Sequence, residues 1–172
     1  MEEIIRIPDE RIGALIGPRG TVKRMIEKKT NAFLEVDSES GEVRVTGEGE
    51  GYFKAADVVK AIARGFSPER AYTLFKDDYL LKLIEMVEFV GKSESNLKAK
   101  RGRVIGREGL ARKAIEKKTR SLVSVYGKTV GIIAMAEDME KAVEAVEMLL
   151  EGAKHETMDM VMDRKKQGRF EL

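Results

Sequence analysis

Two short glycine motifs carry the clearest chemical signal in this sequence. Residues 17–20 (Gly-Pro-Arg-Gly) and 106–109 (Gly-Arg-Glu-Gly) each follow an isoleucine and precede a segment rich in Lys and Arg. Glycine has no β-carbon, so the backbone of a ligand can approach the chain closely there. A helix that begins after the motif turns free N–H groups and the positive end of its dipole toward the same place. The combination suits the phosphate groups of an extended polyanion.

The two motifs belong to an internal repeat. When the sequence is shifted by 89 residues, residues 11–37 align without gaps on residues 100–126, and ten of these 27 positions are identical. The identities include three glycines and the pentapeptide Ile-Glu-Lys-Lys-Thr, at 26–30 and 115–119. Two basic helices can look alike through composition, but composition does not align three glycines as well. The chain is therefore expected to contain two copies of one structural unit.

Each copy is expected to fold as strand, helix, helix, strand, strand and helix. In the first copy the elements are expected, in order, at residues 3–7, 9–16, 21–29, 32–36, 43–45 and 51–64. In the second copy they are expected within 80–90 and at 94–105, 110–118, 121–126, 129–134 and 139–150. The strand within 80–90 depends on the repeat, because its apolar run suits a helix equally well.

The segments outside the repeat also carry helix signals. Ser67 followed by Pro68 predicts the start of a short helix in a structured spacer. Met158, Val161 and Met162 at helical spacing predict a C-terminal helix, with a frayed end from residue 167 onward. The expected fold class is α+β with two tandem units. The expected domains are residues 1–66, a helical spacer at 67–78, a second domain at 79–152, and a C-terminal helix and tail at 153–172.

Charge is segregated along the chain. The whole sequence has 32 basic and 30 acidic residues, a net charge of +2. Residues 11–30 nevertheless contain six basic residues and one acid, and residues 98–120 contain ten basic residues and two acids. Acidic residues concentrate at 35–50 and 137–151. Each copy is therefore expected to have a cationic edge at its glycine motif and an anionic opposite side, which favours oriented binding of a polyanion.

Composition disfavours several kinds of site. The chain has no cysteine and one histidine, His155, so zinc sites of the Cys/His kind, disulfides, and thiol or Ser-His-Asp catalysis lack their residues. We expect no metal, no cofactor and no catalytic residue. No apolar run approaches the ~18 to 20 residues of a membrane helix, so a protein without membrane contact, located in the cytoplasm, is expected.

Three other features have plain structural interpretations. Residues 127–129 (Gly-Lys-Thr) resemble the end of a phosphate-binding P-loop, but a predicted strand covers the start of that motif, so a hairpin turn is favoured. Glu27 and Glu116 recur on solvated helix faces, where salt bridges are favoured over general-base chemistry. The methionines of the C-terminal helix favour core packing, with protein docking as the alternative.

The sequence Ile-Gly-x-x-Gly, a following basic helix that ends Ile-Glu-Lys-Lys-Thr, and the strand after it resemble the type I KH domain, a family of single-stranded nucleic-acid readers. The resemblance covers nearly the whole chain as two modules. It implies, in each module, a three-stranded antiparallel sheet with three helices on one face and a groove for about four nucleotides. The residues implied to bind RNA, with Ile16, Leu34, Ile105 and Val123 on the groove floor, are Ile16, Gly17, Pro18, Arg19, Gly20, Lys23, Arg24, Leu34, Ile105, Gly106, Arg107, Glu108, Gly109, Arg112, Lys113 and Val123.

Two features depart from most KH domains. Lys23 and Arg112 stand where an isoleucine is usual, and Glu108 places a carboxylate in a loop that meets phosphate. The second loop is therefore expected to be the weaker phosphate clamp. A basic residue at this position in both modules, Lys23 and Arg112, resembles one KH subgroup, the small-subunit ribosome-assembly protein that partners the endonuclease Nob-one. That subgroup also has two KH modules and about this length. A composition poor in Asn and Gln and the lack of a long N-terminal extension favour the archaeal form.

The resemblance implies a non-catalytic protein that binds single-stranded RNA near the 3′ end of small-subunit ribosomal RNA during ribosome assembly. It also implies contact with the alpha subunit of translation initiation factor two and with the Nob-one endonuclease. The alternative is a KH-like protein-interaction scaffold in translation or RNA processing with little direct RNA contact. An enzyme is disfavoured, because neither a complete P-loop nor a cluster of acids for a metal is visible.

Overall fold

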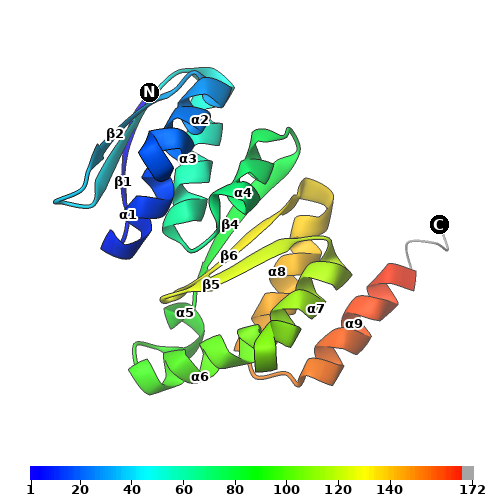
Figure 1. Cartoon of the computed structure of the whole chain (residues 1–172). Helices are drawn as coiled ribbons and strands as arrows, with labels where there is room; N and C mark the ends of the chain where they lie inside the picture. Colours follow the sequence, from blue (N-terminus) through cyan, green and yellow to red (C-terminus); the bar gives the residue numbers. More distant parts are fainter. Residues whose placement is uncertain (168–172) are drawn as a thin grey trace. The chain divides into compact units, whose positions relative to one another are not determined.

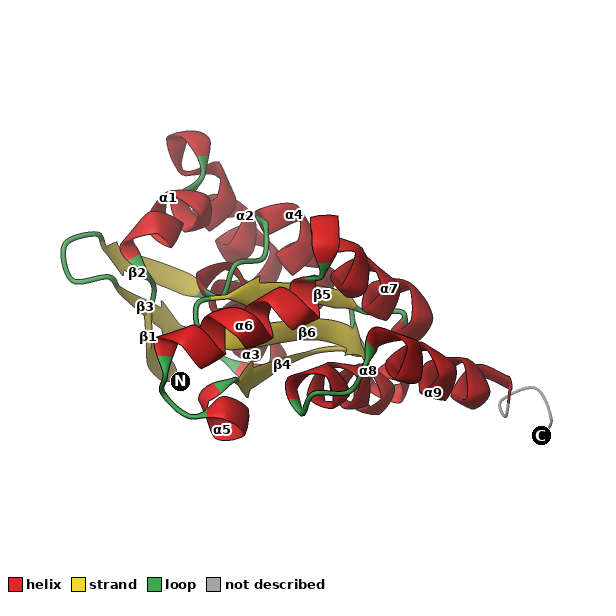
Figure 2. Cartoon of the chain, turned by 90° about the horizontal axis from the view of Figure 1, so that it is seen from below, coloured by secondary structure: helices red, strands yellow, loops and turns green. Residues whose placement is uncertain are grey.

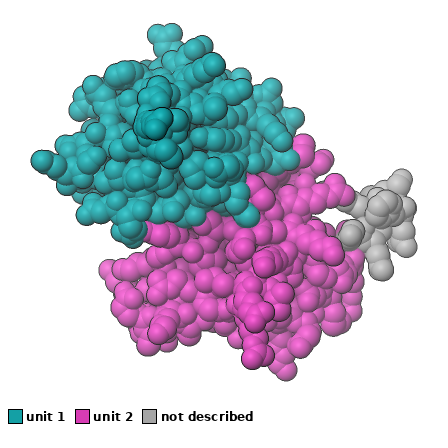
Figure 3. Space-filling model, viewed as in Figure 1, with its two compact units in different colours: residues 1–81 teal, residues 82–172 magenta. Residues whose placement is uncertain are grey.

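The computed structural model describes residues 1–167 and divides the chain into two compact units, Met1–Leu81 and Lys82–Leu172 (Figures 1 and 3). Both units contain the elements in the order that the repeat predicts, and the second unit has one additional short helix after its first strand. The part of the expected C-terminal tail at residues 168–172 lies outside the described residues. Among the described residues, none of the helices combines the length and the apolar character needed to span a membrane.

The first unit is a three-stranded antiparallel sheet with helices packed on one face (Figures 1 and 2). Its strands are β1 (Glu2–Arg6), β2 (Phe33–Asp37) and β3 (Glu42–Thr46), and its main helices are α1 (Asp9–Ile16), α2 (Thr21–Thr30) and α3 (Gly49–Ala63). The strand order β1-β3-β2 leaves β2 at an edge. Leu34 pairs with Val45, and both side chains are fully buried, so alternate residues of the strands face the core.

The second unit repeats this arrangement with the strand order β4-β6-β5, so β5 is the counterpart of the edge strand β2. Its sheet consists of β4 (Tyr79–Glu85), which begins three residues before the boundary between the units, β5 (Leu122–Tyr126) and β6 (Thr129–Met135). Its helices are α5 (Val87–Val90), α6 (Glu94–Ile105), α7 (Leu110–Thr119) and α8 (Ala136–Leu150). The window 80–90 thus contains both a strand and a short helix. Tyr126 pairs with Thr129 across a two-residue turn, which confirms the hairpin at residues 127–128.

Each unit ends in a capping segment that follows its closing helix. In the first unit this segment is α4 (Pro68–Ala71) with the 3-10 turn η2 (Tyr72–Phe75), which packs on α3. In the second unit it is α9 (His155–Gln167), which packs on α7 and α8. Both begin three residues after a glycine, Gly65 or Gly152. The expected spacer at 67–78 therefore lies in the first unit, as the shorter counterpart of α9. Met158 and Met162 are buried, so the methionines of α9 pack in the core of the second unit.

In each unit an arginine binds the end of the closing helix and the loop that leads to the capping segment. Arg11 on α1 donates from Nε to the carbonyl oxygen of Ile62 at 2.9 Å and from Nη2 to that of Phe66 at 2.7 Å. Arg103 on α6 donates to the carbonyl oxygens of Leu149 and Ala153. These two acceptors lie 87 residues after Ile62 and Phe66, the acceptors of Arg11. The repeat aligns Arg11 with Lys100, which lies three residues before Arg103. The two units therefore make the same contact from different turns of the helix that precedes the glycine loop.

Candidate nucleic-acid interface

Each glycine motif forms one 3-10 turn between two helices, η1 (Pro18–Gly20) and η3 (Arg107–Gly109). Gly17 has φ 72° and ψ 173°, and Gly106 has φ 73° and ψ 175°. A β-carbon on Gly17 would lie 2.4 Å from Cγ2 of Val22, and one on Gly106 would lie 2.6 Å from Cβ of Ala111. Glycine is required at both positions by the backbone conformation and by close packing on the next helix.

The third residue of each loop has a left-handed backbone. Arg19 has φ 55° and ψ 28°, and Glu108 has φ 55° and ψ 25°. This conformation costs a residue with a β-carbon roughly 1–2 kcal/mol. Strain of this kind concentrates at binding sites, where the surrounding structure maintains it. Both side chains are exposed, so the tips of the two loops project into solvent.

The helix after each loop brings its cations to the loop. A β-carbon on Gly20 would lie 3.0 Å from Nη1 of Arg24, so this guanidinium extends over the loop of the first unit. A β-carbon on Gly109 would lie 3.9 Å from Cε of Lys113. The N-termini of α2 and α7 start directly after these glycines and add the positive ends of their dipoles. In each unit the structure thus gathers the expected loop residues and a cation of the following helix, Arg24 or Lys113, at one place.

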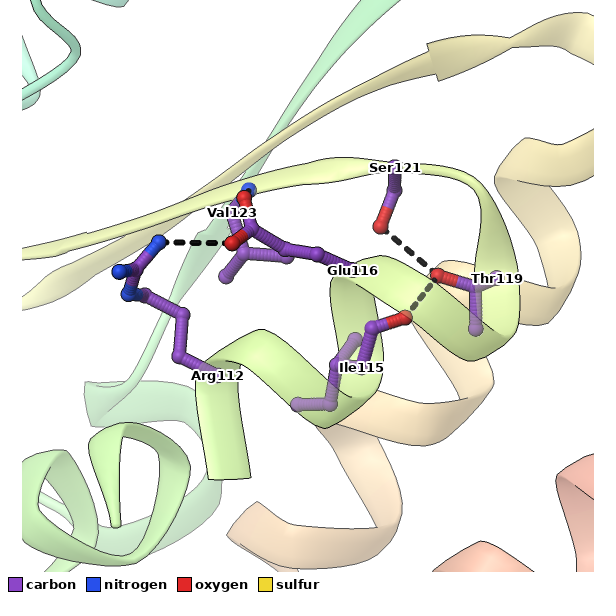
Figure 4. Close-up of polar contacts among 6 residues, drawn as sticks. All are labelled: Arg112, Ile115, Glu116, Thr119, Ser121 and Val123. Atoms are coloured by element: carbon purple, nitrogen blue, oxygen red, sulfur yellow. Dashed lines mark hydrogen bonds and ion pairs between the residues drawn. The ribbon is translucent and has the colours of Figure 1, made fainter. Parts of the chain in front are cut away.

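Arg112 lies beside the loop of the second unit, since a β-carbon on Gly109 would lie 4.0 Å from its Nη2, and its guanidinium is also engaged by a carboxylate. Its Nη1 lies 2.7 Å from Oε1 of Glu116, one turn later on α7 (Figure 4). The other carboxylate oxygen of Glu116 accepts the backbone N–H of Val123 at 3.0 Å. Glu116 therefore joins α7 to the edge strand β5, and Arg112 balances its charge.

The first unit has the same connection. Nζ of Lys23 lies 3.4 Å from Oε1 of Glu27, and this oxygen accepts the backbone N–H of Leu34 at 2.9 Å. The salt bridges expected for Glu27 and Glu116 are confirmed. Their hydrogen bonds to the edge strands were not anticipated, although the recurrence of a glutamate at the same place in both copies is a signal of a shared contact.

The four residues of the expected groove floor differ in burial. The side chains of Leu34 and Val123 are 0% and 1% exposed, because alternate strand residues face the core. Ile16 and Ile105 are partly exposed at the ends of α1 and α6, so their side chains can contact a ligand.

The recurring pentapeptide has a structural explanation. Ile26 and Ile115 are fully buried. Oγ1 of Thr119 donates to the carbonyl oxygen of Ile115 at 2.7 Å and lies 2.7 Å from Oγ of Ser121, which ties the end of α7 to the next strand (Figure 4). Thr30 makes the equivalent bond at the end of α2. The pentapeptide thus fixes the helix that carries the loop against the edge strand.

Part of the cationic charge is engaged within the protein. Nζ of Lys118 lies 2.8 Å from Asp163 and 3.8 Å from Asp159, both on α9. The hydrogen bond that Lys118 donates to Asp163 raises the pKa of Lys118, so this ammonium stays protonated. Arg11 and Arg103 are likewise bound to carbonyl oxygens. The charge available to a ligand is therefore smaller than the sequence count and lies mainly beside the two loops.

Among residues 1–167, no group of three or more His, Cys, Asp or Glu side chains is placed to hold a metal ion. His155 is exposed at the start of α9, and its Nε2 lies 2.9 Å from the carbonyl oxygen of Arg103. This contact gives the histidine a structural partner.

Comparisons with known sequences and structures agree with this fold. Residues 80–167 match the family described as the eukaryotic type KH domain (KH-domain type I), and residues 2–61 match the KH domain. A KH domain-containing protein of Methanocaldococcus jannaschii is 42% identical over 179 aligned residues, which cover 99% of this chain and 78% of the relative. The expectation of two tandem type I KH domains is confirmed.

Solved structures extend the similarity. The crystal structure of Dim2p from Pyrococcus horikoshii is 41% identical, with a TM-score of 0.88, and the match covers 95% of this chain and 99% of that one. The chain matched in a complex of a/eIF2alpha, aDim2p and rRNA from the same organism is 40% identical, with a TM-score of 0.91 and coverage of 98% and 95%.

Proposed function

We propose an RNA-binding function from the premise that this chain belongs to the type I KH-domain family, in the group of two-KH proteins that includes archaeal Dim2p. The proposed ligand is single-stranded RNA near the 3′ end of small-subunit ribosomal RNA, bound during ribosome assembly. The proposed role is non-catalytic, since the site offers groups that bind and position a strand.

One observation carries the proposal: two glycine loops with the same backbone angles each lead into a basic helix beside an edge strand. Each loop allows close approach of a sugar-phosphate backbone, and the helix N-terminus and its cations favour negative charge there. In a KH domain the glycine loop clamps about four backbone nucleotides. Two such clamps on one chain suit a continuous single strand better than a compact anion.

The test is a salt titration of binding to a single-stranded RNA with the 3′-end sequence of small-subunit ribosomal RNA. If two loops engage about eight phosphates, log Kd should rise with log salt with a slope of about 5.6. A scrambled RNA of equal length should bind more weakly at every salt concentration. Binding that barely responds to salt would contradict the proposal and favour the interaction scaffold.

Protein partners follow from the same relationship. A solved relative is in a complex with a/eIF2alpha and rRNA. We extend this to the present chain and propose the alpha subunit of translation initiation factor two as a partner, with the Nob-one endonuclease as a second. Size-exclusion chromatography of the chain with each purified protein, with and without RNA, tests the two contacts separately. Separate elution of both components at micromolar concentration would contradict the contact in question.

A further inference from the structure

The first unit has an exposed aromatic ring beside its glycine loop. Phe33 is the first residue of β2, and its side chain is 57% exposed. Nζ of Lys23 lies 5.7 Å from the centroid of the ring. Lys23 lies in the first turn of α2, three residues after Gly20. The ring therefore stands between the edge strand and the helix that begins at the proposed phosphate clamp.

A single exposed apolar side chain is common on protein surfaces and by itself needs no explanation. The neighbours of Phe33 make it different. Glu27 holds Lys23 in an ion pair and also accepts the N–H of Leu34, the residue after Phe33. The ammonium and the strand backbone that flank the ring are thus both fixed by one carboxylate. The ring keeps a defined place, with one cation near it and more than half of its surface open.

We infer that Phe33 is a stacking platform for one unpaired nucleobase of the bound RNA strand. The inference rests on the proposed RNA-binding function and deepens it by assigning a base-contacting residue. An aromatic ring has a π-face that any base can stack on, and truncation of such a platform weakens binding about 5- to 150-fold per base. Lys23 supports the stack in two ways: it polarises the ring, and its charge attracts the strand to the same place.

The second unit lacks this platform. The repeat aligns Phe33 with Leu122, which is partly buried and has no π-face. The cation at the position of Lys23 is Arg112, which is engaged by Glu116 at 2.7 Å. The two units therefore contact bases differently although their loops have the same shape, and the stacked base belongs to the first unit alone.

The experiment uses the full chain and two matched substitutions. Phe33→Leu installs the residue of the second unit and removes the π-face without changing the charge. Phe53→Leu is the control, because Phe53 is 59% exposed in the same unit but stands on α3, with its ring beside Tyr52. The probe is the single-stranded RNA described above, together with versions that carry one abasic nucleotide at each position in turn.

We expect Phe33→Leu to weaken binding about tenfold and Phe53→Leu to leave it unchanged. The loss should be independent of salt, since no phosphate contact is removed. One abasic position should weaken binding to the natural chain but cause no further loss in Phe33→Leu. That coupling identifies the stacked base, and a merely structural role of Phe33 would not produce it.

A fluorescence measurement also tests whether a base stacks at position 33. The natural chain has no tryptophan, so Phe33→Trp creates a single reporter at the platform. Addition of RNA should quench its fluorescence, whereas the reporter in Phe53→Trp should stay unchanged. Phe33→Leu with natural affinity, no coupled abasic position and no quenching would overturn the inference while RNA binding by the natural chain still stood. Failure of the natural chain to bind RNA would overturn the proposed function itself.

Discussion

The two glycine loops have one shape and two electrostatic characters. Their backbone angles agree within a few degrees, including the left-handed third residue. The first loop presents Pro18 and Arg19, a net charge of +1, and the second presents Arg107 and Glu108, whose charges cancel. The shape follows from the glycines and from packing on the next helix, which both copies share. The two middle residues project into solvent, so their charge can differ without any change in the fold.

The largest expected effect comes from acidic substitutions in both loops. Pro18→Asp with Arg19→Asp changes the charge of the first loop by −3, and Arg107→Asp with Glu108→Asp changes that of the second by −2. We expect RNA affinity, measured by filter binding, to fall about 30-fold for the first variant and about tenfold for the second. Asp tolerates a positive φ, so the loops should keep their shape.

Circular dichroism and thermal unfolding serve as the control for this pair of variants and should match those of the natural chain. A larger loss from the second loop than from the first would reverse the comparison. It would mean that Glu108 does not weaken the second clamp.

The next effect concerns stability. Glu116→Ala should lower the free energy of unfolding by about 2 kcal/mol, because it leaves the N–H of Val123 and the guanidinium of Arg112 without their acceptor. Glu27→Ala should cost less, about 1 kcal/mol, since its ion pair with Lys23 is longer. Urea denaturation measures both.

Glutamine at either position keeps an acceptor for the backbone N–H and is the matched control. It should recover part of the loss. Equal stability of both alanine variants and the natural chain would show that these glutamates do not hold the edge strands.

Reversal of the charge at the second loop should have a smaller effect on binding. Glu108→Lys adds a cation at the loop tip, and we expect RNA affinity to rise about three- to fivefold at low salt. The gain should fade as salt increases, because screening weakens it. Glu108→Gln should give an intermediate affinity. Unchanged affinity at low salt would place the second loop away from phosphate.

The smallest expected effect is on stability and concerns one carboxylate on the closing helix of each unit. Burial raises the pKa of Asp57 on α3, opposed in part by Lys60. The charged form of Asp57 is therefore disfavoured in the folded state, which lowers the free energy of unfolding. This loss of stability is fully present at a pH above the pKa of Asp57 in the folded protein. It vanishes as the pH falls below the pKa of Asp57 in the unfolded chain. Asp57→Asn should raise the free energy of unfolding near neutral pH by up to about 0.5 kcal/mol, with no gain in acid.

The closing helices α3 and α8 have equal length, and when their ends are aligned Glu144 of α8 corresponds to Asp57 of α3. Glu144 pairs with Lys165 from α9, so Glu144→Gln should slightly destabilise the protein near neutral pH. Urea denaturation across the acidic and neutral range measures both variants. A loss of stability in Asp57→Asn at neutral pH would show that its attraction to Lys60 outweighs the cost of burial.

Much of the fold could be read from the sequence, because its signals are local. The glycine motifs, the pentapeptide and the alternating strands recur at one spacing, and the two-KH fold follows from that repetition. The window at 80–90 was harder, since its apolar run suits both β4 and the helix α5 that share it. Periodicity does not separate strand from helix in such short segments.

The candidate site was predicted less completely, because residue type does not give the direction of a side chain across elements. Lys23 and Arg112 were expected beside the RNA from residue type alone, and only the structure shows that each is also paired with a glutamate one turn later, Glu27 or Glu116. The exposure of the Phe33 ring beside the loop is not predictable from the sequence, because a single aromatic residue has no sequence signature of its own.

By itself, the sequence determined that the chain has two copies of one unit, where the glycine loops stand, and that basic residues cluster beside them. These properties depend on order along the chain. Only the tertiary structure decided that Leu34 and Val123 are buried, and that Arg11 and Arg103 make equivalent contacts from different helical turns. Burial depends on which elements pack against each other, and this is not set by order along the chain. The long arginine side chain can reach the pair of carbonyl oxygens at the end of the closing helix from either of two successive turns.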